Sequence, residues 1–341
     1  MKAQFHNIAK ITLVLTYFVI IAGAVVRMTG SGMGCPDWPK CFGYYIPPTE
    51  QQQIEWHPNQ EYHKGQVIIV DEALEVAKTD FITTDTFTKT NWDTYTKHDY
   101  AEFNPIHTWV EYINRLFGVL AGLATIVLAF ASLKYRKEKV LIPILSFLIL
   151  FGMGFQAWLG KTVVDSHLSP FKITVHMVMA LLIVAAILYV IYKTKTEKKT
   201  FVYNTTFTKI LIIASVLTLI QITIGTQVRQ FIDQQIKLLG DQNTALWLNN
   251  PTVSFYIHRS FSIIVLAING YLFFQYKKLK LNYNKINWVV VILIVEVISG
   301  IAMANFSFPF GTQSLHLVLA SILFGIQFYL ILEAANAKNN R

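Results

Sequence analysis

The sequence predicts an all-α integral membrane protein with eight transmembrane helices, arranged as two four-helix bundles related by an internal parallel repeat. Three observations lead to this fold class: long apolar runs, a regular alternation of basic connections, and motifs that recur at fixed offsets in the two halves of the chain. Of the 341 residues, 53% are hydrophobic and only 14% are charged. This composition suits a chain that crosses a membrane several times.

The apolar runs define the helices. A run of about 18 or more mostly apolar residues is typical of a transmembrane helix. The first run is long enough to span and lacks a convincing cleavage site, so we expect it to be a helix of the protein and not a removed signal peptide. The predicted spans are residues 9–27, 107–133, 140–160, 173–192, 209–229, 253–275, 287–304 and 312–333.

The connections between spans predict the orientation. Both termini carry Lys or Arg, and three short connections are basic: KYRKEK (134–139), KTKTEKK (193–199) and KKLKLNYNK (277–285). The loop 28–106 carries 12 of the 20 acidic residues against five Lys. The positive-inside rule then places both termini in the cytoplasm and this loop outside. The net charge of +9 reflects this topology and gives no indication of nucleic-acid binding.

The internal repeat pairs spans 1 to 4 with spans 5 to 8, which divides the chain into halves 1–200 and 201–341. Because each half holds four spans, the two copies have the same orientation, as in parallel repeats. The third and seventh spans match through Gln156 and Gly160 against Glu296 and Gly300. The other matches are YINR (112–115) with YIHR (256–259), VHMVMA (175–180) with LHLVLA (315–320), and GAVVR (23–27) with GTQVR (225–229).

Both cysteines lie in the predicted outer loop, within GAVVRMTGSGMGCPDWPKCFG (23–43). An oxidising compartment allows Cys35 and Cys41 to form a disulfide, which is the interpretation we favour. Two free thiols are the alternative, and a metal site made of two thiols alone is a weaker one. The spacing does not tell whether the disulfide is structural or redox-active.

Three histidines lie within predicted spans: His176, His258 and His316. An ionisable residue inside a membrane indicates function, although a single such histidine is more often hydrogen-bonded between helices. The repeat places His258 and His316 at corresponding depths of one bundle. Facing histidines on two helices are typical axial ligands of a haem. A zinc ion requires three or four ligands, and no Cys or carboxylate accompanies this pair.

The first half lacks the equivalent pair, because the position that matches His258 is Asn114. An amide is a poor iron ligand, so this half is not expected to hold a bis-histidine haem. Its distinctive residue is Glu111, whose counterpart is Phe255. His107, Glu111 and Asn114 are spaced by four and three residues and share one helix face. His107 lies about 10 Å along the helix from position 114, so it reaches the same iron only if the helix slides or the macrocycle tilts.

Several basic residues fall near the outer ends of the spans. Each can pair with a haem propionate, and each can equally extend to lipid head groups. Glu296 lies in the middle of the seventh span, where we expect it to meet a hydrogen-bond donor; its role stays open. The basic residues are Arg27, Arg115, Lys172, Arg229 and Arg259.

Taken together, these motifs resemble the haem A synthase family, over all eight spans. VEYINRLFG (110–118) is similar to the Glu-x-x-His-Arg element of the family, with Asn114 in place of its histidine. QAWLGKTVVDSHL (156–168) is similar to the end of its third helix, and KITVHMVMA (172–180) to its fourth-helix histidine. Cys35 and Cys41 resemble a cysteine pair of some bacterial members. In GAVVRMTGSGMGCPDWP the matching residues are Gly23, Arg27, Thr29, Ser31, Gly32, Trp38 and Pro39.

The resemblance implies oxidation of a methyl group of haem O to a formyl group by successive hydroxylations, giving haem A for terminal oxidases. It implies haem b on His258 and His316, and haem O as substrate near His176 and Glu111. If the substrate iron is held only by His176, its other face is open, as oxygen activation requires. Glu111 would then relay protons or stabilise a cationic intermediate. The second half would transfer electrons or support the structure.

The resemblance also implies partners: the lipid bilayer, a membrane electron donor and the enzyme that produces haem O. The sequence leaves the electron donor and homo-oligomerisation open. The segment 44–104 of the first loop is long, and is interpreted either as an ordered insertion or as a surface that docks an oxidase or electron donor. We weigh two other functions, a non-enzymatic dihaem cytochrome b and a transporter. The unmatched Glu111 argues against the first, and the absence of broken-helix Gly and Pro patterns argues against the second.

Overall fold

Eight long helices make up most of the computed structural model, which describes residues 2–96, 101–166, 168–195 and 200–339. All eight are long and apolar enough to cross a membrane, so the predicted eight-span, all-α class is confirmed. Residues 196–199 of the basic segment 193–199, and residues 97–100 of the long loop, lie outside the described residues. The helices are α1 (Lys2–Met28), α2 (Pro105–Ser132), α3 (Leu141–Asp165), α4 (Pro170–Thr194), α5 (Thr205–Leu239), α6 (Val253–Lys278), α7 (Ile286–Asn305) and α8 (Thr312–Asn339).

Local sequence signals set several helix ends. The side chain of Asn104 accepts hydrogen bonds from the backbone N–H groups of Ile106 and His107, and Pro105 occupies the first turn of α2. These features satisfy free donors at the helix start. Helix α5 continues to Leu239, ten residues beyond the predicted span of 209–229. It does so because Phe231 lies in a buried cluster with residues outside the helix, which stabilises the extra turns.

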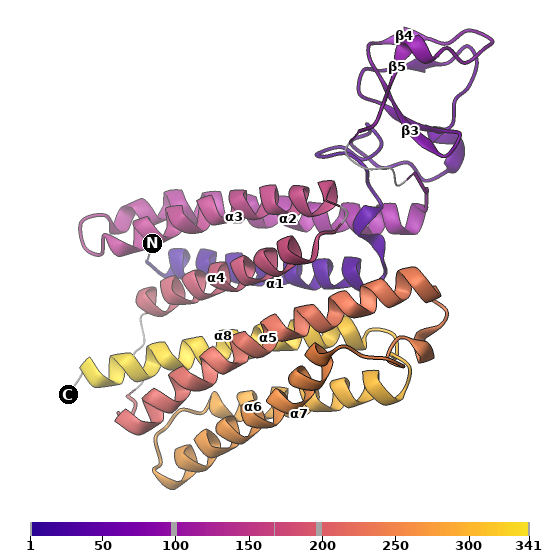
Figure 1. Cartoon of the computed structure of the whole chain (residues 1–341). Coiled ribbons are helices and arrows are strands. Elements are labelled where there is room, and N and C mark those ends of the chain that lie inside the picture. The colour runs from indigo at the N-terminus through magenta and orange to yellow at the C-terminus, as the bar shows by residue number, and fades with distance from the viewer. Residues whose placement is uncertain (1, 97–100, 167, 196–199, 340–341) are drawn as a thin grey trace.

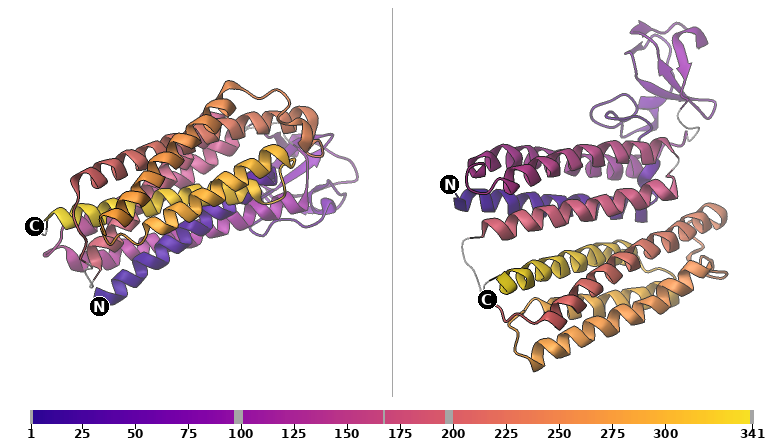
Figure 2. Two further views of the ribbon diagram at one scale, coloured as in Figure 1. Left: turned by 90° about the horizontal axis from the view of Figure 1, so that it is seen from below. Right: turned by 60° about the vertical axis from the view of Figure 1, so that its left-hand side comes forward.

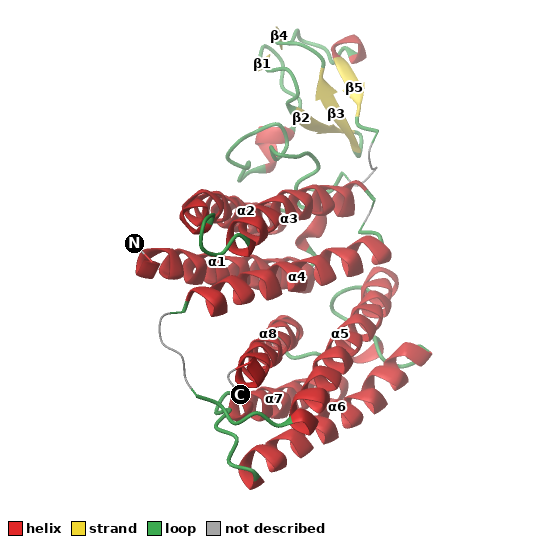
Figure 3. Cartoon of the chain, turned by 90° about the vertical axis from the view of Figure 1, so that its left-hand side faces the viewer, coloured by secondary structure: helices red, strands yellow, loops and turns green. Residues whose placement is uncertain are grey.

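The helices pack as two groups of four, α1–α4 and α5–α8 (Figure 1). In each group the first helix contacts the second and the fourth, and the third contacts the second and the fourth. The end-on view shows each group as a four-helix bundle (Figure 3). Both termini lie at one end of the molecule, and the strands lie at the other (Figure 2). We call the end that carries the strands the outer end.

The two bundles meet through α1 and α4 on one side and α5 and α8 on the other. Two polar contacts near the outer end occupy positions that match in the predicted repeat. The hydroxyl of Ser314 donates to the carbonyl of Ala24 at 3.0 Å, and the hydroxyls of Thr174 and Thr226 lie 2.9 Å apart. Thr174 precedes Ser314 by 140 residues, and Ala24 precedes Thr226 by 202 residues. The internal repeat itself stays a prediction.

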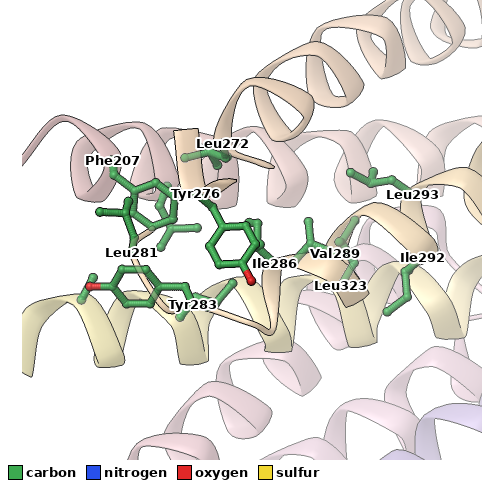
Figure 4. Close-up of a cluster of buried hydrophobic side chains, with 14 of the residues drawn as sticks. Phe207, Leu272, Tyr276, Leu281, Tyr283, Ile286, Val289, Ile292, Leu293 and Leu323 are labelled. Atoms are coloured by element: carbon green, nitrogen blue, oxygen red, sulfur yellow. The ribbon is translucent and has the colours of Figure 1, made fainter. Parts of the chain in front are cut away.

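Apolar packing holds each bundle together away from the histidines. Figure 4 shows the main cluster of the second bundle, where the 278–286 connection folds back against α5, α6 and α8. Tyr283 is fully buried there and stacks on Phe207, with ring centroids 5.1 Å apart. The cluster also includes Leu272, Ile286 and Leu330, all fully buried. This end therefore anchors the helices whose outer halves carry the candidate site.

The insertion in the first loop is a small β unit. One sheet pairs β1 (Glu61–Tyr62) with β4 (Phe81–Ile82), and the other has the order β2 (Val67–Val70), β3 (Ala73–Ala77), β5 (Trp92–Thr94); all pairs are antiparallel. Buried Tyr62 and Trp92 form an aromatic centre with Phe81, with centroids 5.1 to 6.0 Å apart. Of the two interpretations of segment 44–104, an ordered insertion is therefore correct for its described residues. Docking of a partner on it stays a prediction.

Candidate functional site

The second bundle brings two histidines face to face near its outer end. His258 lies in the second turn of α6, and His316 lies in the second turn of α8. Their ring centroids are 6.3 Å apart and the ring planes are inclined by 66°. Bonds from a metal to imidazole nitrogen are about 2.0 Å long, so the gap accommodates one metal ion bound to both rings.

Glycines make room for these rings. A Cβ atom placed on Gly225 of α5 would lie 3.0 Å from Cε1 of His258, and one on Gly300 of α7 would lie 3.7 Å from Cε1 of His316. Each ring thus lies against the bare backbone of a neighbouring helix. A larger residue at Gly225 would displace the ring.

His316 has polar partners on its second ring nitrogen. Its Nδ1 lies 2.8 Å from Oε2 of Glu296 and 2.9 Å from the hydroxyl of Ser299, both on α7. Glu296 therefore meets a donor inside the bundle, as expected from the sequence. The expectation that no carboxylate accompanies the histidine pair is wrong, because apolar periodicity does not show that α7 turns Glu296 toward His316. The Nδ1 atom of His258 is buried and has no hydrogen-bond partner within the described part of the chain.

The first bundle has a related arrangement, with Asn114 at the position that matches His258. A Cβ placed on Gly160 of α3 would lie 3.5 Å from Cε1 of His176, and one on Gly23 of α1 would lie 3.8 Å from Oδ1 of Asn114. Asn114 thus faces α1 as His258 faces α5. The bundle offers one histidine and one amide where the second bundle offers two histidines.

Buried polar atoms in the first bundle lack protein partners. Within the described ranges, Oδ1 of Asn114, Oε1 of Gln156 and Nδ1 of His176 are buried without a hydrogen bond. Gln156 uses its amide nitrogen to donate to the backbone carbonyl of His176 at 2.8 Å. Unsatisfied buried polar atoms are costly in a folded protein, and they are typical of a site that a ligand or water completes.

Glu111 and Arg115 join α2 to the first loop. Oε2 of Glu111 accepts the backbone N–H of Cys35 at 2.8 Å, and Oε1 pairs with Arg115. Arg115 also donates to the backbone carbonyls of Asp37 at 2.7 Å and Lys40 at 2.8 Å. Both side chains are buried or nearly so. The loop is therefore held on the outer end of α2 by charge-assisted hydrogen bonds.

The cysteines in this loop form the predicted disulfide, Cys35–Cys41. Both are fully buried, beside Phe42. Next to them, Oδ2 of Asp37 accepts the backbone N–H of Gly43 at 2.9 Å. Burial raises the pKa of the Asp37 carboxyl, and the nearby hydrogen bonds and Arg115 oppose this shift only in part. The loop is thus a compact, cross-linked cap on the first bundle.

Arg27 and Arg229 meet between the two bundles. Oδ2 of Asp233 accepts from Arg27 at 2.8 Å, and Oδ1 of Asp233 forms an ion pair with Arg229 at 2.9 Å. Arg229 also donates to the backbone carbonyl of Arg27 at 2.7 Å and pairs with Gln313. Asp233 is not among the residues predicted from the sequence. Its position four residues after Arg229 on one helix was the available signal, since such pairs are neighbours on a helix surface.

The remaining predicted residues are dispersed. Lys172 donates to the carbonyl of Thr162 at 3.1 Å, next to the His176 turn of α4. Arg259 is exposed, with its guanidinium 5.4 Å from the ring centroid of Tyr256. His107 lies half-buried in the first turn of α2. A haem ligand role for His107 and propionate pairing by the basic residues stay predictions.

The arrangement defines a multi-pass membrane protein whose two four-helix bundles turn histidines and unsatisfied polar groups toward their centres, near one end of the helices. Comparison with known proteins agrees with this class. The chain belongs to the COX15-CtaA family of cytochrome oxidase assembly proteins, whose model matches residues 6–89 and 65–328.

Similar proteins carry the name heme A synthase. The relative from Ehrlichia canis is 26% identical over 336 residues, covering 92% of this chain and 88% of that protein. The one from Rickettsia prowazekii is 24% identical over 344 residues, covering 93% of each chain. The one from Flavobacterium johnsoniae is 22% identical over 348 residues, also covering 93% of each. The similarity thus extends over both bundles.

Proposed function

We propose that this protein is a haem A synthase, an oxidoreductase that converts a methyl group of haem O to a formyl group by successive hydroxylations. The observation that supports this best is the asymmetry between the bundles. One bundle presents two facing histidines, and the other presents a histidine and a neutral amide at the corresponding positions. One bundle is then suited to hold a haem firmly, and the other to leave one face of a haem free for reaction.

The second bundle is the proposed haem b site. His258 and His316 would hold the haem iron, at a separation that one metal ion fits. Gly225 and Gly300 admit the two rings, because their bare backbones leave space beside them. Arg259 is exposed at the outer end of the same helix as His258 and is placed to pair with a propionate.

The first bundle is the proposed substrate site. His176 would hold the iron of haem O from one side, with Gly160 making room for its ring. Asn114 faces Gly23, and its short neutral side chain leaves the opposite side of the iron open. The bound iron supplies oxygen activation. His107, two turns from Asn114 on α2, is kept as a second residue near the substrate.

Glu111 is the proposed catalytic carboxylate, one turn from Asn114 on α2. The guanidinium of Arg115 and the backbone N–H of Cys35 both donate to it, and these are partners of an ionised carboxylate. Both expected roles, a proton relay and stabilisation of a cationic intermediate, stay proposals. Because the same carboxylate accepts a hydrogen bond from the first loop, it also orients this loop over the substrate site.

The protein would lie in a bacterial-type plasma membrane, with the outer end of the molecule outside the cytoplasm. The basic connections 134–139 and 277–285 and both termini fall at the opposite end of the molecule, which supports a cytoplasmic location for that end by the positive-inside rule (Figure 1). Arg27, Arg115, Arg229 and Lys172 all belong to the outer end. An electron donor and the enzyme that produces haem O are the expected partners in the membrane.

Mass analysis of extracted haems tests the proposal. Membranes that contain the protein together with a source of haem O should yield a formyl-bearing haem. We expect His176→Ala to lose this product and to keep the haem b spectrum, because His258 and His316 are unchanged. Unmodified haem O beside intact haem b in the wild-type protein would refute the enzyme and favour a dihaem electron-transfer protein.

A second comparison separates the roles of the bundles. Glu111→Ala should lower product formation, since it removes a charge beside the substrate, while haem b content stays constant. If Glu111→Ala kept full activity while His258→Ala abolished catalysis without loss of haem b, the proposed division of labour would be wrong. Glu111→Gln serves as the matched variant, because it keeps the size of the side chain.

A further inference from the structure

Glu296 is a carboxyl group in the middle of a membrane helix, and only 9% of its surface is exposed. Such a group is costly in a bilayer, so its position calls for a specific partner. The partner is Nδ1 of His316, 2.8 Å from Oε2 of Glu296. The other carboxylate oxygen, Oε1, is buried without a hydrogen bond within the described part of the chain. Glu296 therefore directs a close polar contact at a proposed iron ligand.

Ser299 fixes the direction of this hydrogen bond. Its hydroxyl donates to the backbone carbonyl of Glu296 at 3.0 Å, so its oxygen is left to accept from Nδ1 of His316 at 2.9 Å. With Glu296 as a carboxylate, both neighbours of Nδ1 are acceptors, and Nδ1 then carries the proton. Nε2 of His316 is left with a free lone pair, which is the form that binds a metal.

The first bundle lacks this arrangement at the matching positions. The repeat offset of 140 residues pairs Glu296 with Gln156 and Ser299 with Leu159. Gln156 donates to the backbone carbonyl of His176, not to its ring. Within the described ranges, Nδ1 of His176 has no partner. The contact between a carboxylate and a histidine ring therefore distinguishes the second bundle from the first.

We propose that Glu296 is a positioning residue for haem b, which holds His316 in its iron-binding tautomer and lowers the reduction potential of the second-bundle iron. The inference rests on the proposed haem b site. A carboxylate that accepts from Nδ1 makes the imidazole a stronger electron donor. A negative charge near the iron also stabilises the more positive, oxidised state. The second-bundle haem is thereby made a better electron donor.

Redox titration of the haem b spectrum in the purified full-length protein tests this. In Glu296→Gln the neutral amide removes the charge but keeps the shape of the side chain. At a fixed ambient potential, the ratio of reduced to oxidised haem b should rise about tenfold, which corresponds to an upward shift of 59 mV for a one-electron couple. Ser299→Ala should shift the ratio in the same direction by less, since one neutral acceptor is lost.

The matched control is Glu333→Gln, which removes a buried carboxyl from α8 at the opposite end of the same bundle. Glu333 pairs with Lys285 and lies about 25 Å along the helix from His316, so the potential of haem b should not change. A spectroscopic check accompanies each variant: the low-spin electron paramagnetic resonance signal of the oxidised haem should move in Glu296→Gln, because the donor strength of His316 has changed.

The outcomes distinguish failure of the proposed haem b site from failure of the proposed role of Glu296. A wild-type protein without haem b would overturn the proposed haem b site itself. Haem b that is retained with an unchanged potential in both Glu296→Gln and Ser299→Ala would overturn the role of Glu296 alone. If Glu296→Gln fails to retain haem, Ser299→Ala decides: an upward shift supports the proposal, and an unchanged potential refutes it.

Discussion

Substitution of Gly225 by alanine should weaken haem b binding selectively. The added Cβ would lie 3.0 Å from Cε1 of His258, closer than ordinary van der Waals contact. The ring cannot simply accept this contact, because Nδ1 and Nε2 lie only 3.5 and 3.9 Å from the same point. His258 must therefore move by a few tenths of an ångström, or α5 must separate from α6.

The size of the effect follows from the precision that a metal site demands. A ligand must be held within about 0.5 Å of its productive position, and overpacking of a filled site costs about 1–3 kcal/mol. Since 1.4 kcal/mol is a factor of ten, we expect haem b to bind about five- to 150-fold more weakly in Gly225→Ala. Folding should be less affected, because the cost falls on one ring and not on the apolar core.

Gly300 and Gly23 provide matched controls for the Gly225 substitution. A Cβ would lie 3.7 Å from His316 at Gly300, and 3.8 Å from Asn114 at Gly23, both ordinary contacts. The measurement is haem b per purified protein, from the reduced-minus-oxidised spectrum, after competition with an excess of a haem-scavenging protein. Gly225→Ala should lose haem b fastest. Equal retention by Gly225→Ala and Gly300→Ala, or faster loss from Gly23→Ala, would refute the packing argument.

Three further predictions concern the outer end of the molecule. Replacing Cys35 and Cys41 by serine should lower the free energy of unfolding of the loop by about 2 kcal/mol, because the cross-link closes a short ring; limited proteolysis of the loop measures this. Burial raises the pKa of Asp37 above its ordinary 3.8, so the folded protein holds this proton more tightly than the unfolded chain does. The stability that Asp37 contributes is therefore fully present below pH 3.8, and it is lost as the pH rises through the raised pKa. Asp37→Asn should remove this pH-dependent loss of stability. Between about pH 4 and pH 7, the melting temperature of the variant should therefore fall less than that of the wild-type protein. Asp233→Asn should lower stability by about 1–3 kcal/mol, a value reduced for partial exposure, because it leaves two arginines without their shared partner. Asp165→Asn, which breaks a partly exposed pair with the single cation Lys161, should cost less than about 1 kcal/mol in the same thermal unfolding assay.

The helices could be predicted from the sequence because their signal is local. An apolar run of sufficient length has no stable alternative in a bilayer, since only a helix satisfies every backbone group within the segment. The β unit could not be predicted in the same way. Its strands are two to five residues long and owe their stability to buried aromatic side chains such as Tyr62 and Trp92, which come from distant parts of the loop.

The site was predictable in part for a similar reason. His258 and His316 stand out because a histidine is unusual in an apolar span, and the repeat places them at one depth. The partner of Glu111 is a backbone N–H 76 residues away in the loop, and a sequence carries no marker for such a contact. The contact of Glu296 with His316 spans two helices and depends on their relative rotation, which apolar periodicity alone does not fix.

The carboxylate of Asp233 bears on how the two halves recognise each other. Arg27 and Arg229 are counterparts at an offset of 202 residues, whereas the residue that matches Asp233 in the first half is Ser31. Two identical halves facing each other across a twofold axis would bring together two arginines with either two acids or none. A single acid on that axis therefore requires two halves of different sequence. Each half therefore fits the other better than it fits a copy of itself, which disfavours exchange of halves between neighbouring molecules.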